Sequence, residues 1–304
     1  MKTGTGWVRC DPQTKIDDTW CFPQYVAEEG QLMEENSVNA LARAACNHFM
    51  ELSRNCRYNE QWPFVIVAAS PELAKRAKSL RKKMMEICIK SMSRVMKLSK
   101  DRVGESRKYS GLLGVLISPT ELWVFQSFWF GGQSRMRDDP LAPSRSYLKA
   151  EEAFSVMNRQ PQSGETVVDL GAAPGGWSYA AAKRGAFITA IDNGPMKNGA
   201  HNHDSIQHVK SDGISYAPKR KGFDWLFCDM VEDPSRVLEL LQRWISQKWC
   251  THFVVNLKYG HTDPMLLLKR IYSPNHGLYR TINDLRVRHL YHDREEMTLM
   301  GSCK

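Results

Sequence analysis

The sequence has 304 residues, of which 42% are hydrophobic and 25% are charged, and its formal net charge is +9. This composition is ordinary for a globular protein and leaves room for two domains or one large one. No apolar run approaches the ~20 residues of a membrane-spanning helix, and the N-terminus lacks the apolar core of a signal peptide. We therefore expect a cytoplasmic protein rather than a membrane or secreted one.

The eight cysteines are scattered and lack the spacing of zinc ligands. We expect reduced thiols, no disulfide and no metal. The pair His201 and His203 has no further candidate ligands nearby in the sequence.

The first part of the chain is predicted to be a small α/β unit. Its expected elements are a short strand at residues 7–10, a helix at 38–52, a buried strand at 64–70, a helix starting at Pro71, and strands at 112–117 and 122–128. The helix after Pro71 carries an apolar face made of Leu73, Ala77, Leu80, Met84 and Ile87.

The positive charge is concentrated in that same helix and the segment after it. Between Lys75 and Lys108 there are thirteen Lys or Arg residues and three acids. Such a block favours a polyanionic partner, most simply a nucleic acid. A solvated helix face is the alternative interpretation.

A polar linker at residues 131–143 leads to a second unit in which strands alternate with helices. The expected strands are residues 166–170, 187–191, 206–209, 224–228 and 253–257, followed by a hairpin at 285–290 and 297–300. A helix begins at Pro234 with Asp233 as its N-cap. This alternation predicts a doubly wound, mainly parallel sheet with a terminal antiparallel hairpin. We place the two domains at residues 1–135 and 136–304.

The most informative stretch is DLGAAPGGW at residues 169–177, where an apolar strand runs into a glycine turn and then a helix. Bare backbone in such a turn allows a nucleotide-like ligand to come close to main-chain N–H groups. The next strand ends at Asp192, about 20 residues after the first glycine, where a carboxylate can bind ribose hydroxyls. A tight turn without a ligand is the competing interpretation.

Charged residues follow each predicted parallel strand, at the edge where such sheets bind ligands. They are Asp169, Asp192, Asp212, Asp229 and Lys258. A cationic adenosine cofactor such as S-adenosylmethionine suits these acids better than NAD, whose pyrophosphate they would repel. Asp212 taken alone is equally well explained as a turn residue.

These motifs resemble the FtsJ class of Rossmann-like methyltransferases and, more closely, the ribosomal RNA large subunit methyltransferase M family. The resemblance rests on residues 142–154, 169–177, 192–196, 228–232, 256–258 and 290–296. It implies a class I methyltransferase domain preceded by a smaller THUMP-like RNA-binding α/β domain. Family members usually carry a further ferredoxin-like subdomain, for which the residues before Phe64 are too few, so we expect an N-terminally shortened domain.

The resemblance also implies the site. Its Lys-Asp-Lys-Glu catalytic set falls on Lys149, Asp229, Lys258 and Glu296, with Glu295 as the alternative for the last position. The implied contacts with S-adenosylmethionine are Ser146, Ala173, Pro174, Gly175, Gly176, Asp192, Asp212 and Asp229.

These residue types suit methyl transfer to a ribose 2′-hydroxyl, which needs a base to take its proton. An ordinary lysine is protonated at neutral pH, and burial or a neighbouring ammonium such as Lys149 would shift Lys258 toward the neutral form. The carboxylates of Asp229 and Glu296 act in the opposite direction, so we expect them to orient the lysines.

The resemblance implies 2′-O-methylation of a cytidine in large-subunit (23S) rRNA, with that RNA as partner, and we expect a monomer that acts without a membrane. The alternatives are a 2′-O-methyltransferase for tRNA or an mRNA cap, a non-catalytic RNA-binding assembly factor, and, least favoured, an NAD-dependent dehydrogenase.

Overall fold

The chain folds into two compact units. In the computed structural model, one unit contains Met1–Asp17 and Pro23–Gly131, and the other contains Asp18–Phe22 and Gly132–Lys304. The structure describes residues 2–4, 7–10, 21–54, 56–101, 108–130, 136–219, 222–274 and 277–304. Part of the predicted linker, residues 131–135, lies outside them. None of the helices in the described part has the length and apolar character to cross a membrane.

The first unit is a mixed sheet with two helices on one face. The sheet has the order β3-β8-β7-β5-β6, with β4 also pairing with β8, and β1 and β2 form a separate two-stranded sheet. The strands are β1 (Lys2–Gly4), β2 (Trp7–Arg9), β3 (Tyr25–Ala27), β4 (Gln31–Glu34), β5 (Trp62–Ala68), β6 (Ser99–Lys100), β7 (Lys108–Leu116) and β8 (Glu121–Phe130). The predicted α/β character of this segment is confirmed.

Helices α1 (Val38–Ser53) and α2 (Ala74–Met96) form the core of this unit with the sheet. The side chain of Ser37 caps α1 by accepting a hydrogen bond from the N–H of Ala40 at 3.1 Å. The helix predicted from Pro71 starts as a 3-10 turn, η1 (Pro71–Leu73), and continues as α2. The middle of its predicted apolar face is buried, with Leu80 and Met84 fully inaccessible.

The second unit is built on a seven-stranded sheet with the order β11-β10-β9-β12-β13-β15-β14. The five strands from β11 to β13 in this order are parallel to one another. Strand β15 pairs antiparallel with both of its neighbours, β13 and β14. The strands are β9 (Thr166–Leu170), β10 (Phe187–Ile191), β11 (Ile206–Val209), β12 (Phe223–Cys228), β13 (Cys250–Lys258), β14 (Ile282–Arg288) and β15 (Glu296–Cys303). Both the predicted parallel sheet and its terminal antiparallel hairpin are therefore confirmed.

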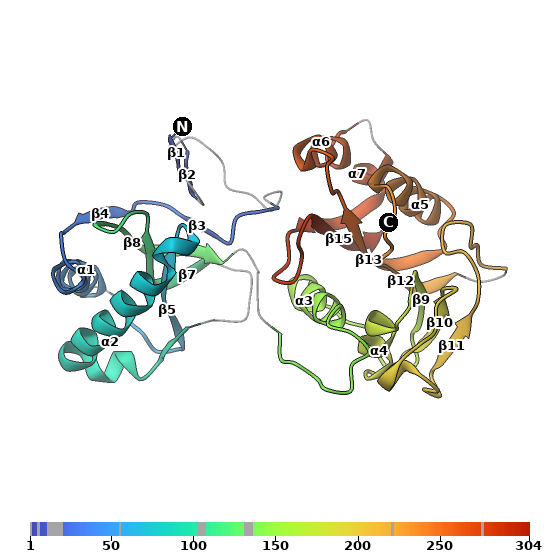
Figure 1. Ribbon diagram of the computed structural model, residues 1–304, viewed down its shortest axis with the longest axis horizontal. Coiled ribbons are helices and arrows are strands. Elements are labelled where there is room, and N and C mark those ends of the chain that lie inside the picture. The colour runs from blue at the N-terminus through green and yellow to red at the C-terminus, as the bar shows by residue number, and fades with distance from the viewer. Residues whose placement is uncertain are drawn as a thin grey trace. The chain divides into compact units, whose positions relative to one another are not determined.

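Helices cover both faces of this sheet, as Figure 1 shows for the yellow-to-red half of the chain. On one face, α3 (Tyr147–Met157) and α4 (Gly176–Ala182) pack into one apolar cluster. On the other face, α5 (Pro234–Ser246), α6 (Pro264–Ile271) and α7 (Gly277–Thr281) pack into a second. A 3-10 turn, η2 (Asn198–Ala200), follows β10.

The predicted cap of α5 is confirmed, because the Asp233 side chain accepts a hydrogen bond from the N–H of Ser235 at 2.8 Å. Pro234 occupies the first turn, where its missing N–H costs nothing.

The direction of strand addition reverses between β9 and β12. From β9 the chain proceeds to β10 and β11 on one side and then crosses to β12 and β13 on the other. In open parallel sheets, ligands bind beyond the carboxyl ends of the strands at such a switch point. The glycine turn after β9 and Asp229 after β12 both lie at this position.

Candidate active site

The turn after β9 requires glycine at two positions. Gly171 and Gly175 have φ angles of +73° and +106°, a region that other residues rarely adopt. A Cβ on Gly175 would lie 2.5 Å from Cβ of Ala200, and one on Gly176 would lie 2.5 Å from Oγ of Ser146. The turn is therefore tight and has no side chains of its own at its closest approaches.

Most N–H groups of this turn are used within the protein. Those of Gly171 and Ala172 donate to the carbonyl oxygen of Ile191 at 2.9 and 3.2 Å, and that of Gly175 donates to Ala172 O at 2.6 Å. The N–H of Ala173 donates to Oδ2 of Asp192 at 3.0 Å. The sequence suggested that these N–H groups face a ligand, but three of the four hold the turn against the end of β10, and that of Gly175 closes the turn on itself. What the turn offers to a ligand is bare backbone surface.

The acids that follow the strands differ in their surroundings. Asp192 is half-buried beside the glycine turn, and its other oxygen accepts from the N–H of Gly194 at 2.7 Å. Asp212 is exposed, and its two oxygens accept from the N–H groups of Ile214 and Ser215 at 3.2 and 3.1 Å. The hydroxyl of Ser215, together with these two N–H groups, lowers the pKa of the Asp212 carboxyl. These contacts account for Asp212 as a turn residue.

Asp169 lies inside the protein rather than at the open edge of the sheet. Its side chain is buried and accepts a hydrogen bond from Oγ of Ser178 at 2.7 Å. Burial raises the pKa of this carboxyl to about 7. Asp169 thus fastens β9 to α4.

Strand register brings the predicted catalytic residues together. Lys258 at the end of β13 is directly opposite Glu296 at the start of β15. Asp229 follows the last residue of β12, the parallel neighbour of β13. Val254 on β13 and Met300 on β15 contribute to the cluster that contains α3. Since side chains alternate between faces, Lys258 and Glu296 project toward α3, the helix that carries Lys149.

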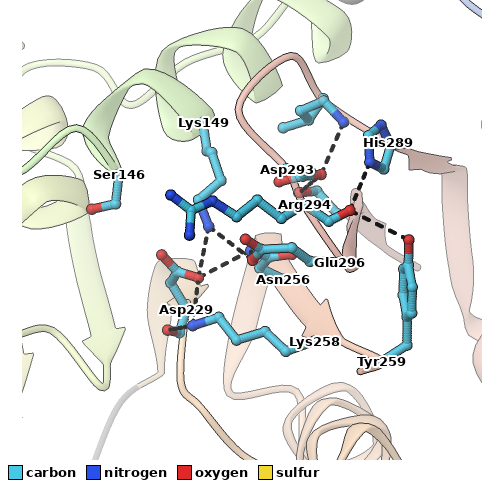
Figure 2. Close-up of polar contacts among 12 residues, drawn as sticks. Ser146, Lys149, Asp229, Asn256, Lys258, Tyr259, His289, Asp293, Arg294 and Glu296 are labelled. Atoms are coloured by element: carbon cyan, nitrogen blue, oxygen red, sulfur yellow. Dashed lines mark hydrogen bonds and ion pairs between the residues drawn. The ribbon is translucent and has the colours of Figure 1, made fainter. Parts of the chain in front are cut away.

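The four residues form one polar cluster (Figure 2). Nζ of Lys149 lies 3.1 Å from Oδ1 of Asp229 and 3.0 Å from Oε2 of Glu296. Nζ of Lys258 donates to the main-chain oxygen of Asp229 at 2.7 Å and lies 3.1 Å from its Oδ1. The structure therefore joins Lys149, Asp229, Lys258 and Glu296, with the side chain of Glu296, and not the exposed Glu295, in contact with Lys149.

The two lysines have different environments. The side chain of Lys149 is 7% exposed and that of Lys258 is 25% exposed. Burial by itself would lower the pKa of Lys149, but Asp229 and Glu296 together outweigh this effect and raise it above its usual value. Lys149 is thus an ammonium group at neutral pH that the two carboxylates share.

Sequence reasoning missed a fifth polar residue of the cluster, Asn256. Its Nδ2 donates to Oδ1 of Asp229 at 3.0 Å and also to Oε2 of Glu296. Asn256 lies two residues before Lys258 on β13, so strand alternation would have placed both on the same face.

The turn between β14 and β15 is fixed to its surroundings on both sides of the cluster. The N–H of Tyr291 donates to the buried Glu152 of α3 at 2.8 Å. The buried Asp293 accepts from the N–H of Leu290 at 2.9 Å and from the hydroxyl of Thr298 at 3.2 Å. Burial raises the pKa of Asp293 to about 7. These contacts give the turn a structural role, because it leads directly into Glu296 at the start of β15.

A short N-terminal segment belongs to this unit as well. The N–H of His289 donates to Cys21 O at 3.0 Å. The ring of Phe22 packs edge-on against Tyr259, the residue after Lys258, with 6.5 Å between centroids. The predicted first domain, residues 1–135, included this segment, whereas its described residues, Cys21 and Phe22, pack with the second unit.

The residues expected to contact a cofactor occupy one region of the sheet edge, with one exception. Ser146, at the start of α3, contacts Ser144 through its hydroxyl at 2.7 Å and faces Gly176. Ala173, Pro174, Gly175 and Gly176 form the turn itself, and Asp192 and Asp229 end the strands on either side. Asp212 is engaged in its own turn after β11. Among the described residues, no group of three or more His, Cys, Asp and Glu side chains could hold a metal ion.

Bare backbone between carboxylates is what a cationic adenosine cofactor would need, because a side chain would fill the space and an anion would be repelled. The residues present therefore fit S-adenosylmethionine.

Comparison with known proteins identifies the domain. Residues 142–255 match the model of the FtsJ-like methyltransferase family. The chain is 39% identical to a ribosomal RNA large subunit methyltransferase M from Idiomarina loihiensis, in an alignment covering 57% of this chain and 50% of that protein. The protein of the same name from Thauera aminoaromatica is 39% identical, over 59% of this chain and 51% of that protein. The one from Aggregatibacter aphrophilus is 40% identical, over 55% of this chain and 49% of that protein. The chain spans about half the length of these curated relatives.

These matches confirm the expected resemblance and the methyltransferase fold. The match to the FtsJ-like methyltransferase family lies within the second unit, over residues 142–255, and it indicates S-adenosylmethionine as the cofactor.

Proposed function

We propose that this protein, through its FtsJ-like methyltransferase domain, methylates the ribose 2′-hydroxyl of a cytidine in large-subunit (23S) rRNA. The observation that carries the proposal is the unequal pairing of the two lysines. Lys149 binds both carboxylates of the cluster, whereas Lys258 pairs, among the described residues, with Asp229 and not with Glu296. The RNA class is supported by the name that the relatives share, and the cytidine by the family resemblance.

Lys258 is the residue proposed as general base. A 2′-hydroxyl is too weak an acid to ionise at neutral pH, so a base must accept its proton during the reaction. Lys149 cannot serve, because its two carboxylate partners hold it as an ammonium. Lys258 is more exposed and has the main-chain oxygen of Asp229 to orient its amine.

In the proposed reaction, the hydroxyl proton would pass to Nζ of the neutral Lys258 amine while the hydroxyl oxygen forms a bond to the methyl carbon. The bond between that carbon and the sulfonium sulfur would break at the same time and leave S-adenosylhomocysteine. S-adenosylmethionine, when bound, supplies an electrophilic methyl group. Asp229 and Glu296, which share the ammonium group of Lys149, keep Lys258 and the acceptor in line with the methyl group. Ser146, the glycine turn, Asp192 and Asp229 are the proposed cofactor contacts, and Asp212 is a proposed contact beyond them.

The first unit is the proposed RNA-binding domain, of the THUMP-like kind. On α2 the lysines at 75, 78, 82 and 90 are exposed, and such a row of cations suits a phosphate backbone. Lys78 and Arg81 line a hollow of about 560 Å³ next to β5 and η1, together with apolar side chains such as Ile66. We place this activity in the cytoplasm, with the protein acting as a monomer.

The experiment that tests this function is methylation of unmodified large-subunit rRNA by the purified protein with methyl-labelled S-adenosylmethionine. We expect label on a single ribose 2′-oxygen of a cytidine, located by mass mapping. Transfer RNA and capped mRNA serve as competing substrates, and preferential labelling of either would overturn the rRNA assignment. Failure to label any RNA would contradict the proposed activity.

A further inference from the structure

We propose that Asn256 is a positioning residue of the catalytic cluster, whose neutral amide holds the carboxylates of Asp229 and Glu296 in the arrangement that binds Lys149. This inference rests on the proposed function, since it assigns Asn256 a role in that reaction.

The contacts of Asn256 complete a ring. Its Nδ2 donates to Oδ1 of Asp229 and to Oε2 of Glu296. Nζ of Lys149 donates to the same two oxygen atoms. Two donors and two acceptors therefore alternate in a closed ring of four hydrogen bonds, which Figure 2 shows between α3 and the ends of the strands. Asn256 is the one uncharged member of that ring.

The amide can face the ring only through its nitrogen. If it were reversed, the carbonyl oxygen of Asn256 would face two carboxylates, and neither could donate a hydrogen bond while ionised. In the observed orientation, Oδ1 of Asn256 is buried and has no hydrogen-bond partner among the described residues. An unpaired buried carbonyl is unfavourable, so an apolar side chain would be the better choice for packing. The N–H donor of the side-chain amide therefore accounts for asparagine at this position.

A neutral donor is the group that this charge arrangement requires. Asp229 and Glu296 are like charges that share one ammonium, and an added acid would repel them, whereas an added lysine would compete with Lys149. Oδ1 of Asp229 already lies 3.1 Å from Nζ of Lys258. Without the Asn256 donor, this carboxylate is free to turn toward Lys258 and hold it as an ammonium, which cannot accept a proton.

Kinetics of Asn256→Ala test the proposal through pH. In single-turnover methyl transfer, we expect the pH at which the rate rises to its half-maximum to increase by about one unit, because Lys258 is held more tightly in its charged form. At pH 7.5 the rate should fall roughly tenfold and recover as the pH increases, with the affinity for S-adenosylhomocysteine unchanged. Asn256→Asp, which replaces the donor by a further acid, should shift the profile in the same direction.

His252→Ala is the matched control. His252 is also buried on the same face of β13, and its Nδ1 pairs with Oγ of Ser302 at 2.8 Å, away from the cluster. This truncation should leave the midpoint of the pH profile where it is. A loss of rate in Asn256→Ala that is uniform across pH, or no loss, would overturn the positioning role.

A second measurement separates failure of this inference from failure of the proposed function. In protein labelled with ¹⁵N-asparagine, the side-chain amide of Asn256 should show slow hydrogen exchange in the wild type and a changed shift in Glu296→Gln. Glu232→Gln, a change at a half-buried acid paired with Arg236, should leave that resonance in place. Rapid exchange in the wild type, or an unmoved signal in Glu296→Gln, would refute the ring whether or not any RNA is methylated.

Discussion

At the scale of single residues, the acids of the sheet edge divide by their hydrogen-bond partners. Asp229 and Glu296 pair with lysines, Asp192 receives two backbone N–H groups, and Asp169 is sealed against Ser178. One sequence pattern, an acid at each strand end, therefore contains both candidate site groups and structural ones.

Asp169→Asn should make the protein less sensitive to pH. Its carboxyl has a pKa of about 7 in the folded protein and about 3.9 when unfolded, so the folded state binds the proton more tightly. The stability from this group is complete below about pH 4 and is lost as the pH rises through 7, by at most about 4 kcal/mol. Asparagine has no titrating carboxyl, so its contribution to stability does not change with pH.

We therefore expect Asp169→Asn to gain stability relative to the wild type between pH 4 and pH 7, measured by denaturant unfolding across that range. Asp204→Asn, at an exposed acid, provides the control and should follow the wild type. Parallel curves for Asp169→Asn and the wild type would show that Asp169 is not a buried titrating group.

The proposed catalytic set could be named before the structure only because the motifs resemble a known family. Lys149, Asp229, Lys258 and Glu296 are far apart in the sequence, and their meeting depends on the register of β13 with β15. Asn256 was missed because an asparagine in an apolar strand has no spacing signature. Only the two carboxylates around it reveal its use.

At the scale of elements, helices and strands were predicted correctly where their apolar residues form the pattern expected from their burial. The predicted bounds of β9, β10 and β11 match the observed ones. The runs of β9 and β10 are mainly apolar, as in strands of a covered parallel sheet, whereas the edge strand β11 includes Gln207 and His208. Helix α3 was not predicted, since it turns Lys149 and Glu152 toward the protein interior and so breaks the usual polar and apolar division. The short strands β3 and β4, half-buried at most, were missed for lack of an apolar run.

Helix α2 is the element expected to bind the RNA backbone. Replacing Lys75 and Lys78, both exposed, by Gln should weaken RNA binding and reduce the slope of log affinity against log salt by about one for each phosphate that is no longer neutralised. The measurement is a salt series of RNA binding by fluorescence anisotropy.

The matched control replaces two exposed lysines of the second unit, Lys248 and Lys269, by Gln. An equal change in slope in both double variants would mean that only net charge matters and that α2 is an ordinary solvated face.

At the scale of the whole molecule, the chain joins two units with different tasks in the proposed function. The first presents cations on α2, and the second holds the glycine turn and the polar cluster at the switch point of its sheet. The division into two compact units follows from two separate sets of apolar clusters. The packing of Cys21 and Phe22 with the second unit could not be predicted, because it depends on contacts such as that of Cys21 O with the N–H of His289.

The central claim is that Lys258 accepts the proton of an RNA ribose hydroxyl, and Lys258→Met tests it most directly. Methionine keeps much of the side-chain length and removes the amine. In single-turnover methyl transfer to unmodified large-subunit rRNA, we predict a rate at least about 100-fold below that of the wild type, with S-adenosylhomocysteine bound as tightly as before. A Lys258→Met protein that methylates the RNA within a few-fold of the wild-type rate would contradict the account.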